Sequence, residues 1–426
     1  MIEYINIIIS FFYFLFFSSF FIDKNKINFF NNQVTSLIYL ISFLLIISFF
    51  NINHLYTFAV IIVLRIYFLI FINKSNDIFY KIKNNFLFTL IIFAVFFILS
   101  IDVASNTQLG WDAQNYFFEK VINFNEQKNF NEFRSNGAAH YPHLLEFLWS
   151  FFWKIHFFNS GQEYLGRIFF IYFYLLSIIY LVNNLVIKDS SKIFFFLLLV
   201  ILSYKSIYFN GNLEILAFSL FLILSIDLSI IINQKNYVPH IPRILLTILC
   251  LVWTKNECTV LVFINLIIFY FFYPFKKKII LNYLFIPFMF MVSLRLFFNH
   301  YYKFDVVDYQ FSKTLSLDIN YLFKGFVIIS EELIKGLFKN IILLISLLFI
   351  GLNIFSKKKN IFYKFQLIQS LFFIIFLYCA FLFNLPDVEW QTKVAIDRVL
   401  FVLSGSLFIS FKFYLDRELK SLKKQF

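Results

Sequence analysis

Apolar residues occur along the chain in long runs that short polar segments separate. Thirteen runs stand out, and most approach the roughly 20 residues that a helix needs to cross the hydrocarbon core of a bilayer. The runs cover residues 4–22, 35–50, 55–72, 86–101, 164–187, 193–209, 213–232, 242–254, 258–273, 279–298, 337–355, 361–384 and 396–414. This pattern predicts an all-α polytopic membrane protein with about 13 transmembrane helices.

Composition supports the membrane assignment. Of the 426 residues, 61% are hydrophobic and 14% are charged, whereas soluble domains are about 45–50% apolar and about 25% charged. A soluble core could not bury this much apolar surface, so the lipid bilayer is an expected partner. The three cysteines are scattered, which does not match a zinc site or a disulfide framework.

Basic residues predict the orientation of the helices, because cytoplasmic loops carry an excess of Lys and Arg. Alternate loops with their adjoining helix ends hold 21 Lys and Arg against 5 Asp and Glu, whereas the opposite loops hold 15 against 17. The basic set comprises "DKNKIN", "NKSNDIFYKIKNN", "IKDSSK", "NQKNYVPHIPR", "FKKK", "SKKKN" and the tail "RELKSLKKQF". The net charge of +13 therefore reflects topology and is not a nucleic-acid signal.

Two long polar segments, residues 102–163 and about 299–336, are predicted to lie on the outer side. Loops of this length within compact architecture are usually functional. The chain has only 9 Gly and 6 Pro, and channels and broken-helix transporters depend on Gly and Pro interruptions. The outer loops are therefore the expected place for chemistry.

The first outer loop predicts two helices that lie along the membrane interface. The text "DAQNYFFEKVINF" reads as a helix that Asp112 caps, with Asp112, Tyr116 and Glu119 on one face. The opposite face is apolar: Phe117, Val121 and Phe124. A second helix is predicted from Pro142 to Ile155.

The second predicted helix carries a narrow polar stripe among Leu, Phe and Trp. The stripe consists of His143, Glu146, Ser150 and Lys154. Such a helix is expected to lie in the interface with the stripe toward water or a cleft. His140 lies in the polar turn between the two helices.

This arrangement resembles the GT-C class of membrane glycosyltransferases over about Ala94 to Tyr172. The likeness consists of a transmembrane helix, a "D-x-x-x-Y" start of an interfacial helix, and the segment "YPHLLEFLW". Two later segments are compatible with it. "LVWTKNECTVLVF" is similar to a "K-x-E-G" segment of several members, with Cys258 in place of Gly, and "AIDRVLF" is similar to their last, Arg-bearing helix.

The resemblance implies a sugar donor on a polyprenyl-phosphate carrier and transfer with inversion to a glycan, lipid or protein acceptor. It implies a division into an N-terminal three-helix membrane segment, residues 1–85, and a catalytic membrane module, residues 86–426. The expected location is a bacterial inner membrane, with the active site facing the periplasm or cell exterior. A carboxylate near the acceptor hydroxyl serves as general base, and cationic groups meet the leaving phosphate.

Asp112 is the expected general base, with Asp102 and Glu119 as alternatives. The residues expected to bind substrate or carrier are His140, His143, Glu119, Lys255, Glu257 and Arg398. Each also has a structural explanation: a helix cap, a histidine bonded to backbone, a charged turn or a polar helix start. A divalent metal is an open alternative, but the sequence shows no set of three ligands.

Three other ionisable positions have mainly structural interpretations. Arg167 and Arg295 lie near outer helix ends and are expected to reach lipid head groups. Asp227 lies within an apolar run and is interpreted as a buried structural carboxylate, with a proton relay as the alternative. Two other function classes stay open: a surface-polysaccharide polymerase or ligase, and a transporter of lipid-linked glycans that does no chemistry.

Overall fold

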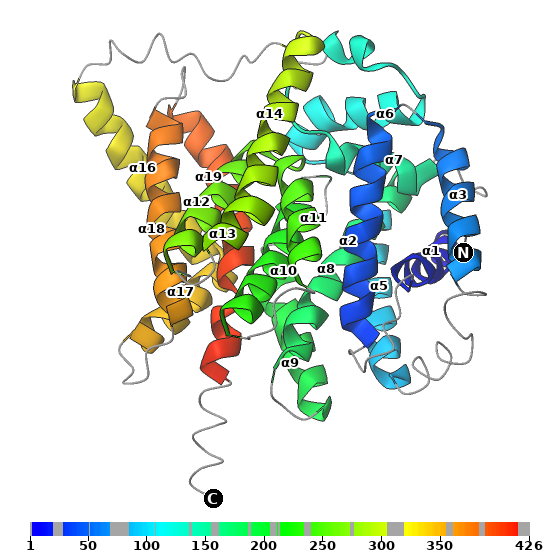
Figure 1. The fold of residues 1–426 in the computed structure, drawn as a ribbon, viewed down its shortest axis with the longest axis horizontal. Helices are drawn as coiled ribbons and strands as arrows, with labels where there is room; N and C mark the ends of the chain where they lie inside the picture. The colour runs from blue at the N-terminus through cyan, green and yellow to red at the C-terminus, as the bar shows by residue number, and fades with distance from the viewer. Residues whose placement is uncertain are drawn as a thin grey trace, which may run out of the picture. The chain divides into compact units, whose positions relative to one another are not determined.

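The computed structural model shows a helical protein and describes most of the chain (Figure 1). The described residues are 2–19, 29–50, 52–68, 85–106, 108–135, 139–154, 162–185, 189–204, 211, 214–233, 240–272, 277–304, 319–354, 361–382 and 388–415. Within these ranges the regular structure is helical and contains no strand. The all-α class is therefore confirmed.

The chain forms two compact units. The first comprises Met1–Val200 and Tyr208–Ser219, and the second comprises Ile201–Ile207 and Leu220–Phe426. The first unit contains α1 (Ile2–Ser18), α2 (Phe29–Ser48), α3 (His54–Tyr67), α5 (Phe86–Ser105), η2 (Ala113–Phe117), α6 (Phe118–Asn125), η3 (Phe130–Ser135), α7 (Leu144–Lys154) and α8 (Tyr164–Asn183). The helices α9 (Asp189–Tyr204) and α10 (Glu214–Asn233) contribute residues to both units.

The remaining helices belong to the second unit. They are α11 (Ile241–Val252), α12 (Asn256–Phe272), α13 (Lys277–Ile280), η6 (Leu281–Phe285), α14 (Ile286–Tyr301), α16 (Ile319–Lys339), α17 (Ile341–Ile354), α18 (Ile361–Leu382) and α19 (Val388–Leu407). Here α16, α17 and α18 all pack against α19. Most of α16 falls within the second predicted outer loop, which ends at about residue 336. The last residue of the helix, Lys339, forms an ion pair with Asp397 on α19 at 2.8 Å.

Each of the thirteen predicted runs overlaps a helix, but fewer helices are long and apolar enough to cross a membrane. Among the described residues, seven pass by length and hydropathy. They are Phe29–Ser48, Phe86–Ser105, Tyr164–Asn183, Glu214–Ile232, Leu281–Tyr301, Phe362–Leu382 and Val388–Leu415. An eighth span results if Tyr321–Lys339 and Ile341–Ile354, which meet at 93°, act as one. The chain is an integral membrane protein by this criterion, and the number thirteen stays a prediction.

The helix α8 forms the centre of the first unit. It contacts α1, α2, α5 and α7, and its spanning segment is buried throughout. Gly166 in its first turn permits close packing, because a Cβ atom there would lie 2.2 Å from the Trp149 carbonyl oxygen on α7. Aromatic rings fill the same contact, with Phe152 of α7 stacked on Phe169 at 3.8 Å between centroids.

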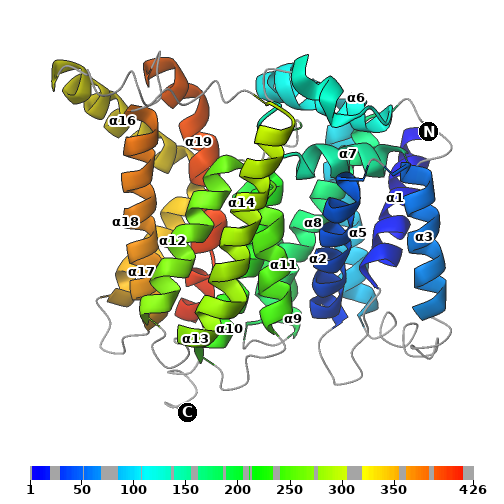
Figure 2. The ribbon, with the colours of Figure 1, turned by 45° about the horizontal axis from the view of Figure 1, so that its top comes forward.

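The two helices predicted within the first outer loop are both present. Figure 2 shows α6 at the upper ends of the upright helices of this unit and α7 running crosswise below it, and α7 contacts both α2 and α8. The second of them begins at Leu144, two residues after the predicted start at Pro142. Their position at a membrane surface stays a prediction.

Candidate active site

Asp112 lies in the first turn of the helix that follows α5. The helix begins at Trp111, since the Gln114 N–H donates to the Gly110 carbonyl at 2.8 Å. Asp112 itself has helical angles of φ −65° and ψ −39°, and its side chain makes no capping hydrogen bond, so the expected cap is wrong. The partly exposed carboxylate instead occupies the helix end where the macrodipole favours negative charge.

The segment η2, which follows Asp112, is a π-helical turn. The Phe118 N–H donates to the Ala113 carbonyl, five residues earlier, so the turn is wider than an α-helical one. Asp112 and Tyr116 are both partly exposed, and Glu119 is exposed. The predicted apolar face is buried and therefore confirmed: Phe117, Val121 and Phe124.

Lys120 is a buried cation that sequence reasoning missed. Its side chain is 1% exposed, and its ammonium lies 3.8 Å from a carboxylate oxygen of Glu146 on α7. The same ammonium donates a hydrogen bond to the Tyr141 carbonyl at 3.1 Å. Lys120 therefore connects α6 to the turn that contains His140 and Tyr141. Lysine is almost never fully buried unless it is paired, so the sequence alone did not suggest this role.

Glu146 is fully buried beside this cation. Within the described part of the chain, neither of its carboxylate oxygens has a hydrogen-bond partner. Burial raises the pKa of Glu146 to about 7, and the positive charge of Lys120 opposes that rise. The carboxyl group therefore holds its proton to a higher pH than an exposed glutamate does.

Two more residues of the predicted stripe on α7 are buried, and the fourth, Lys154, is partly exposed. His143 Nε2 lies 2.9 Å from Ser48 Oγ on α2, and Ser150 Oγ lies 2.9 Å from His54 Nε2 on α3. Lys154, at the end of the helix, donates to Asn125 Oδ1 at 3.1 Å. The stripe was expected to face water or a cleft, but three of its four residues, His143, Glu146 and Ser150, lie buried against the helices that cover α7.

The expected carrier-binding residues of the first unit do not share one exposed surface. His140 and His143 are each 3% exposed, whereas Glu119 on α6 is exposed. The His140 ring lies 4.6 Å from the ring of Tyr141. Asp102, the alternative base, is exposed in the last turn of α5.

Arg167 is buried and ion-paired, so its expected placement among lipid head groups is wrong. Its guanidinium donates to both carboxylate oxygens of Glu163, at 2.9 and 2.5 Å. It also lies 5.9 Å from the centroid of the Trp149 ring, and the Trp149 indole N–H donates to the Glu163 carbonyl at 3.0 Å. Burial raises the pKa of Glu163 against the opposing effect of Arg167. This cluster fixes the start of α8 against α7.

In the second unit, Lys255 lies in the turn between α11 and α12 and forms an ion pair at 3.4 Å with Glu257 in the first turn of α12. Arg295 on α14 donates to the Val252 carbonyl at 3.0 Å and also to the Asn256 side chain. Arg295 therefore ties α14 to this turn, which corrects the expectation that it reaches lipid head groups.

Arg398 lies on α19, one residue after the Asp397 that pairs with Lys339. Its side chain is partly exposed. The Nε–H group donates to the Val394 carbonyl of the preceding turn at 3.2 Å.

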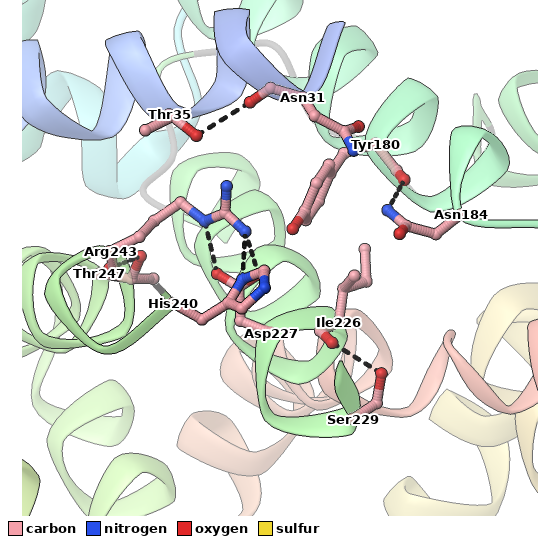
Figure 3. A network of polar contacts seen from close by, with 10 residues as sticks. All are labelled: Asn31, Thr35, Tyr180, Asn184, Ile226, Asp227, Ser229, His240, Arg243 and Thr247. Atoms are coloured by element: carbon pink, nitrogen blue, oxygen red, sulfur yellow. Dashed lines mark hydrogen bonds and ion pairs between the residues drawn. The ribbon is translucent and has the colours of Figure 1, made fainter. Parts of the chain in front are cut away.

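Asp227 forms a buried ion pair, which favours the structural interpretation. Arg243 donates to its two carboxylate oxygens at 2.8 and 2.5 Å, and His240 Nδ1 lies 3.8 Å from one of them (Figure 3). The pair connects α10 to α11 through bidentate geometry. Asp227 and Arg243 lie on different helices, 16 residues apart, so the sequence alone did not reveal that they pair.

Within the described ranges, no group of three or more His, Cys, Asp and Glu side chains is arranged to hold a metal ion. No protein-family model, curated protein or solved structure matches the chain.

Proposed function

We propose that the chain is a membrane glycosyltransferase that moves a sugar from a polyprenyl-phosphate carrier to an acceptor hydroxyl with inversion. The general base is Asp112. The observation that supports the proposal best is the placement of this carboxylate. It lies in the first turn of a helix that directly follows the candidate span α5 and lies across the ends of the upright helices.

The position of Asp112 suits proton acceptance at a membrane surface. A lipid-linked donor carries its sugar at the membrane surface, which is where the ends of spanning helices lie. The carboxylate is partly exposed there, so both can reach it. A carboxylate oxygen at this place is the group that accepts the hydroxyl proton.

The buried cation Lys120 has a positioning role in this proposal. Its hydrogen bond to the Tyr141 carbonyl holds the turn beside His140 against α6, and α6 continues directly from the helical turn that carries Asp112. In the second unit, Lys255 and Arg398 are the cations that the resemblance assigns to the carrier phosphate, with Glu257 as the ion-pair partner of Lys255.

The test is the substitution Asp112→Asn in purified protein reconstituted with a polyprenyl-phosphate-linked sugar and candidate acceptors. We expect transfer to fall by about 10²–10⁴-fold, because the amide cannot accept a proton. Folding should be unchanged, because asparagine has the same shape and size as aspartate.

The matched control is Glu126→Gln. Glu126 is an exposed carboxylate at the end of α6, paired with Lys128 at 2.8 Å, and its removal should leave the rate within about twofold. If Asp112→Asn kept full activity, the general base would have to be Asp102 or Glu119. Dispensability of all three carboxylates, or no consumption of carrier-linked sugar by the unmodified protein, would refute the glycosyltransferase function.

A further inference from the structure

A surface groove lies between the C-terminal part of α12 and the turn that joins α13 to α14, within the second unit. Its volume is about 180 Å³ and its exposed lining is apolar. The lining residues are Ile267, Tyr270, Phe271, Ile280, Leu281 and Phe285. Ligand pockets for compact small molecules usually measure about 300–1,000 Å³ and contain placed polar groups. This groove therefore suits part of one hydrocarbon chain better than a sugar or nucleotide.

The local sequence explains why the helix is irregular at this groove. Pro287 lacks an N–H group, so it cannot donate to the Tyr283 carbonyl as an α-helix requires. The preceding residue, Ile286, donates instead to the carbonyl of Leu281, five residues earlier. The result is the π-helical turn η6, and two of its residues, Leu281 and Phe285, line the groove. Such turns occur frequently at functional sites.

A cation lies at one end of the groove. The ammonium of Lys277 lies 5.0 Å from the ring centroid of Tyr270, a lining residue. Lys277 is exposed and precedes the lining residue Ile280 by one helical turn. In the sequence it is the middle of three consecutive lysines, and no Asp or Glu occurs between Glu257 and Asp305. The charge beside the groove is thus positive and is not opposed by acids of the same helices.

We propose that this groove binds an anionic phospholipid. One acyl chain lies along the apolar lining, and the head-group phosphate pairs with the Lys277 ammonium. Apolar surface in a membrane protein is covered by lipid chains, and basic residues beside such surface select anionic head groups. The charge pattern assigns the segment "FKKK", which contains Lys277, to the cytoplasmic side, where anionic lipids concentrate.

Lipid selectivity at the groove can be measured with a tryptophan reporter. Phe271 lines the groove and is 68% exposed, so Phe271→Trp places an indole beside the bound chain. The variant is reconstituted into vesicles of phosphatidylcholine and phosphatidylglycerol in which one of the two lipids carries brominated chains. Quenching is compared with that of the unmodified protein, which contains five Trp.

We expect brominated phosphatidylglycerol to occupy the site about fivefold more readily than brominated phosphatidylcholine, the effect of roughly one lysine near a membrane surface. Adding Lys277→Gln should reduce the preference to about onefold to twofold. The matched control is Lys412→Gln, which removes the charge of another lysine that lies over a ring, that of Phe413 at 5.1 Å. This control should retain the preference.

A third variant tests the groove itself. Leu281 is partly exposed at 42%, so Leu281→Phe fills the groove without changing charge and should weaken quenching by both lipids. Equal quenching by the two lipids in the Phe271→Trp protein would overturn the proposal. An equal loss of preference in Lys277→Gln and Lys412→Gln would also overturn it, because the selectivity would then be a property of the whole basic surface.

Discussion

Glu146 shows how burial changes the chemistry of a residue that the sequence places on a polar stripe. The side chain is fully buried, its nearest cation is Lys120 at 3.8 Å, and its pKa rises to about 7. A fully buried carboxylate without hydrogen-bond partners is costly when ionised, even with one cation beside it. Its proton is therefore bound more tightly in the folded protein than in the unfolded chain.

This tight proton binding predicts a pH dependence of stability. The folded-state pKa of Glu146 lies above the ordinary value of 4.5, so the free energy of unfolding should fall as pH rises from about 4.5 to about 7. The decrease should be on the order of 1–3 kcal/mol. Glu146→Gln should remove this part of the slope in thermal unfolding of detergent-solubilised protein between pH 5 and 8.

The exposed carboxylate Glu126 supplies the comparison for that experiment. Its side chain is 54% exposed, so Glu126→Gln should leave the pH slope of the unmodified protein unchanged. An identical slope in Glu146→Gln would mean that Glu146 is already ionised in the folded protein at pH 5.

At the scale of elements, the contact between α7 and α8 holds α7, and α6 packed on it, in place. Trp149 donates to the Glu163 carbonyl, and Arg167 closes the same cluster through Glu163. The two backbones meet where Gly166 faces Trp149. A side chain at this glycine would have to displace main-chain atoms, which dense packing resists.

Gly166→Ala should therefore destabilise the protein by about 1–3 kcal/mol. The added Cβ would lie 2.2 Å from the Trp149 carbonyl oxygen and cannot be accommodated by a side-chain rotation. Gly351→Ala on α17 is the matched control, because a Cβ there meets nothing within 4 Å. It should be neutral or should stabilise the helix by up to about 1 kcal/mol. Equal unfolding midpoints for the two variants would contradict close packing of α7 on α8.

For the whole molecule, the arrangement of charges predicts the topology. Reporter fusions at Asn131, on η3, and at Asn360, which lies outside the described residues, should give signals from opposite sides of the membrane. The reason is the excess of Lys and Arg in alternate loops. A pair of fusions at Ser135 and Asn131 should agree with each other. Signals from the same side at Asn131 and Asn360 would refute the predicted order of spans.

The sequence by itself determined the helical class, the positions of the apolar helices and the two short helices of the first outer loop. It also placed Phe117, Val121 and Phe124 on the buried face of α6. These features depend on local periodicity and on the composition of single segments, which a sequence carries directly. The function and the number of membrane spans were also inferred from the sequence, and both stay predictions.

Only the tertiary structure decided which polar side chains meet. It paired Lys120 with Glu146, Asp227 with Arg243 and His143 with Ser48. It also buried most of the polar stripe of α7. Helices that precede α7 in the sequence and the helix that follows it pack against it. The physical reason is that helical periodicity defines a polar face but not its neighbour. Whether such a face meets water, lipid or another polar group depends on contacts between residues far apart in the chain.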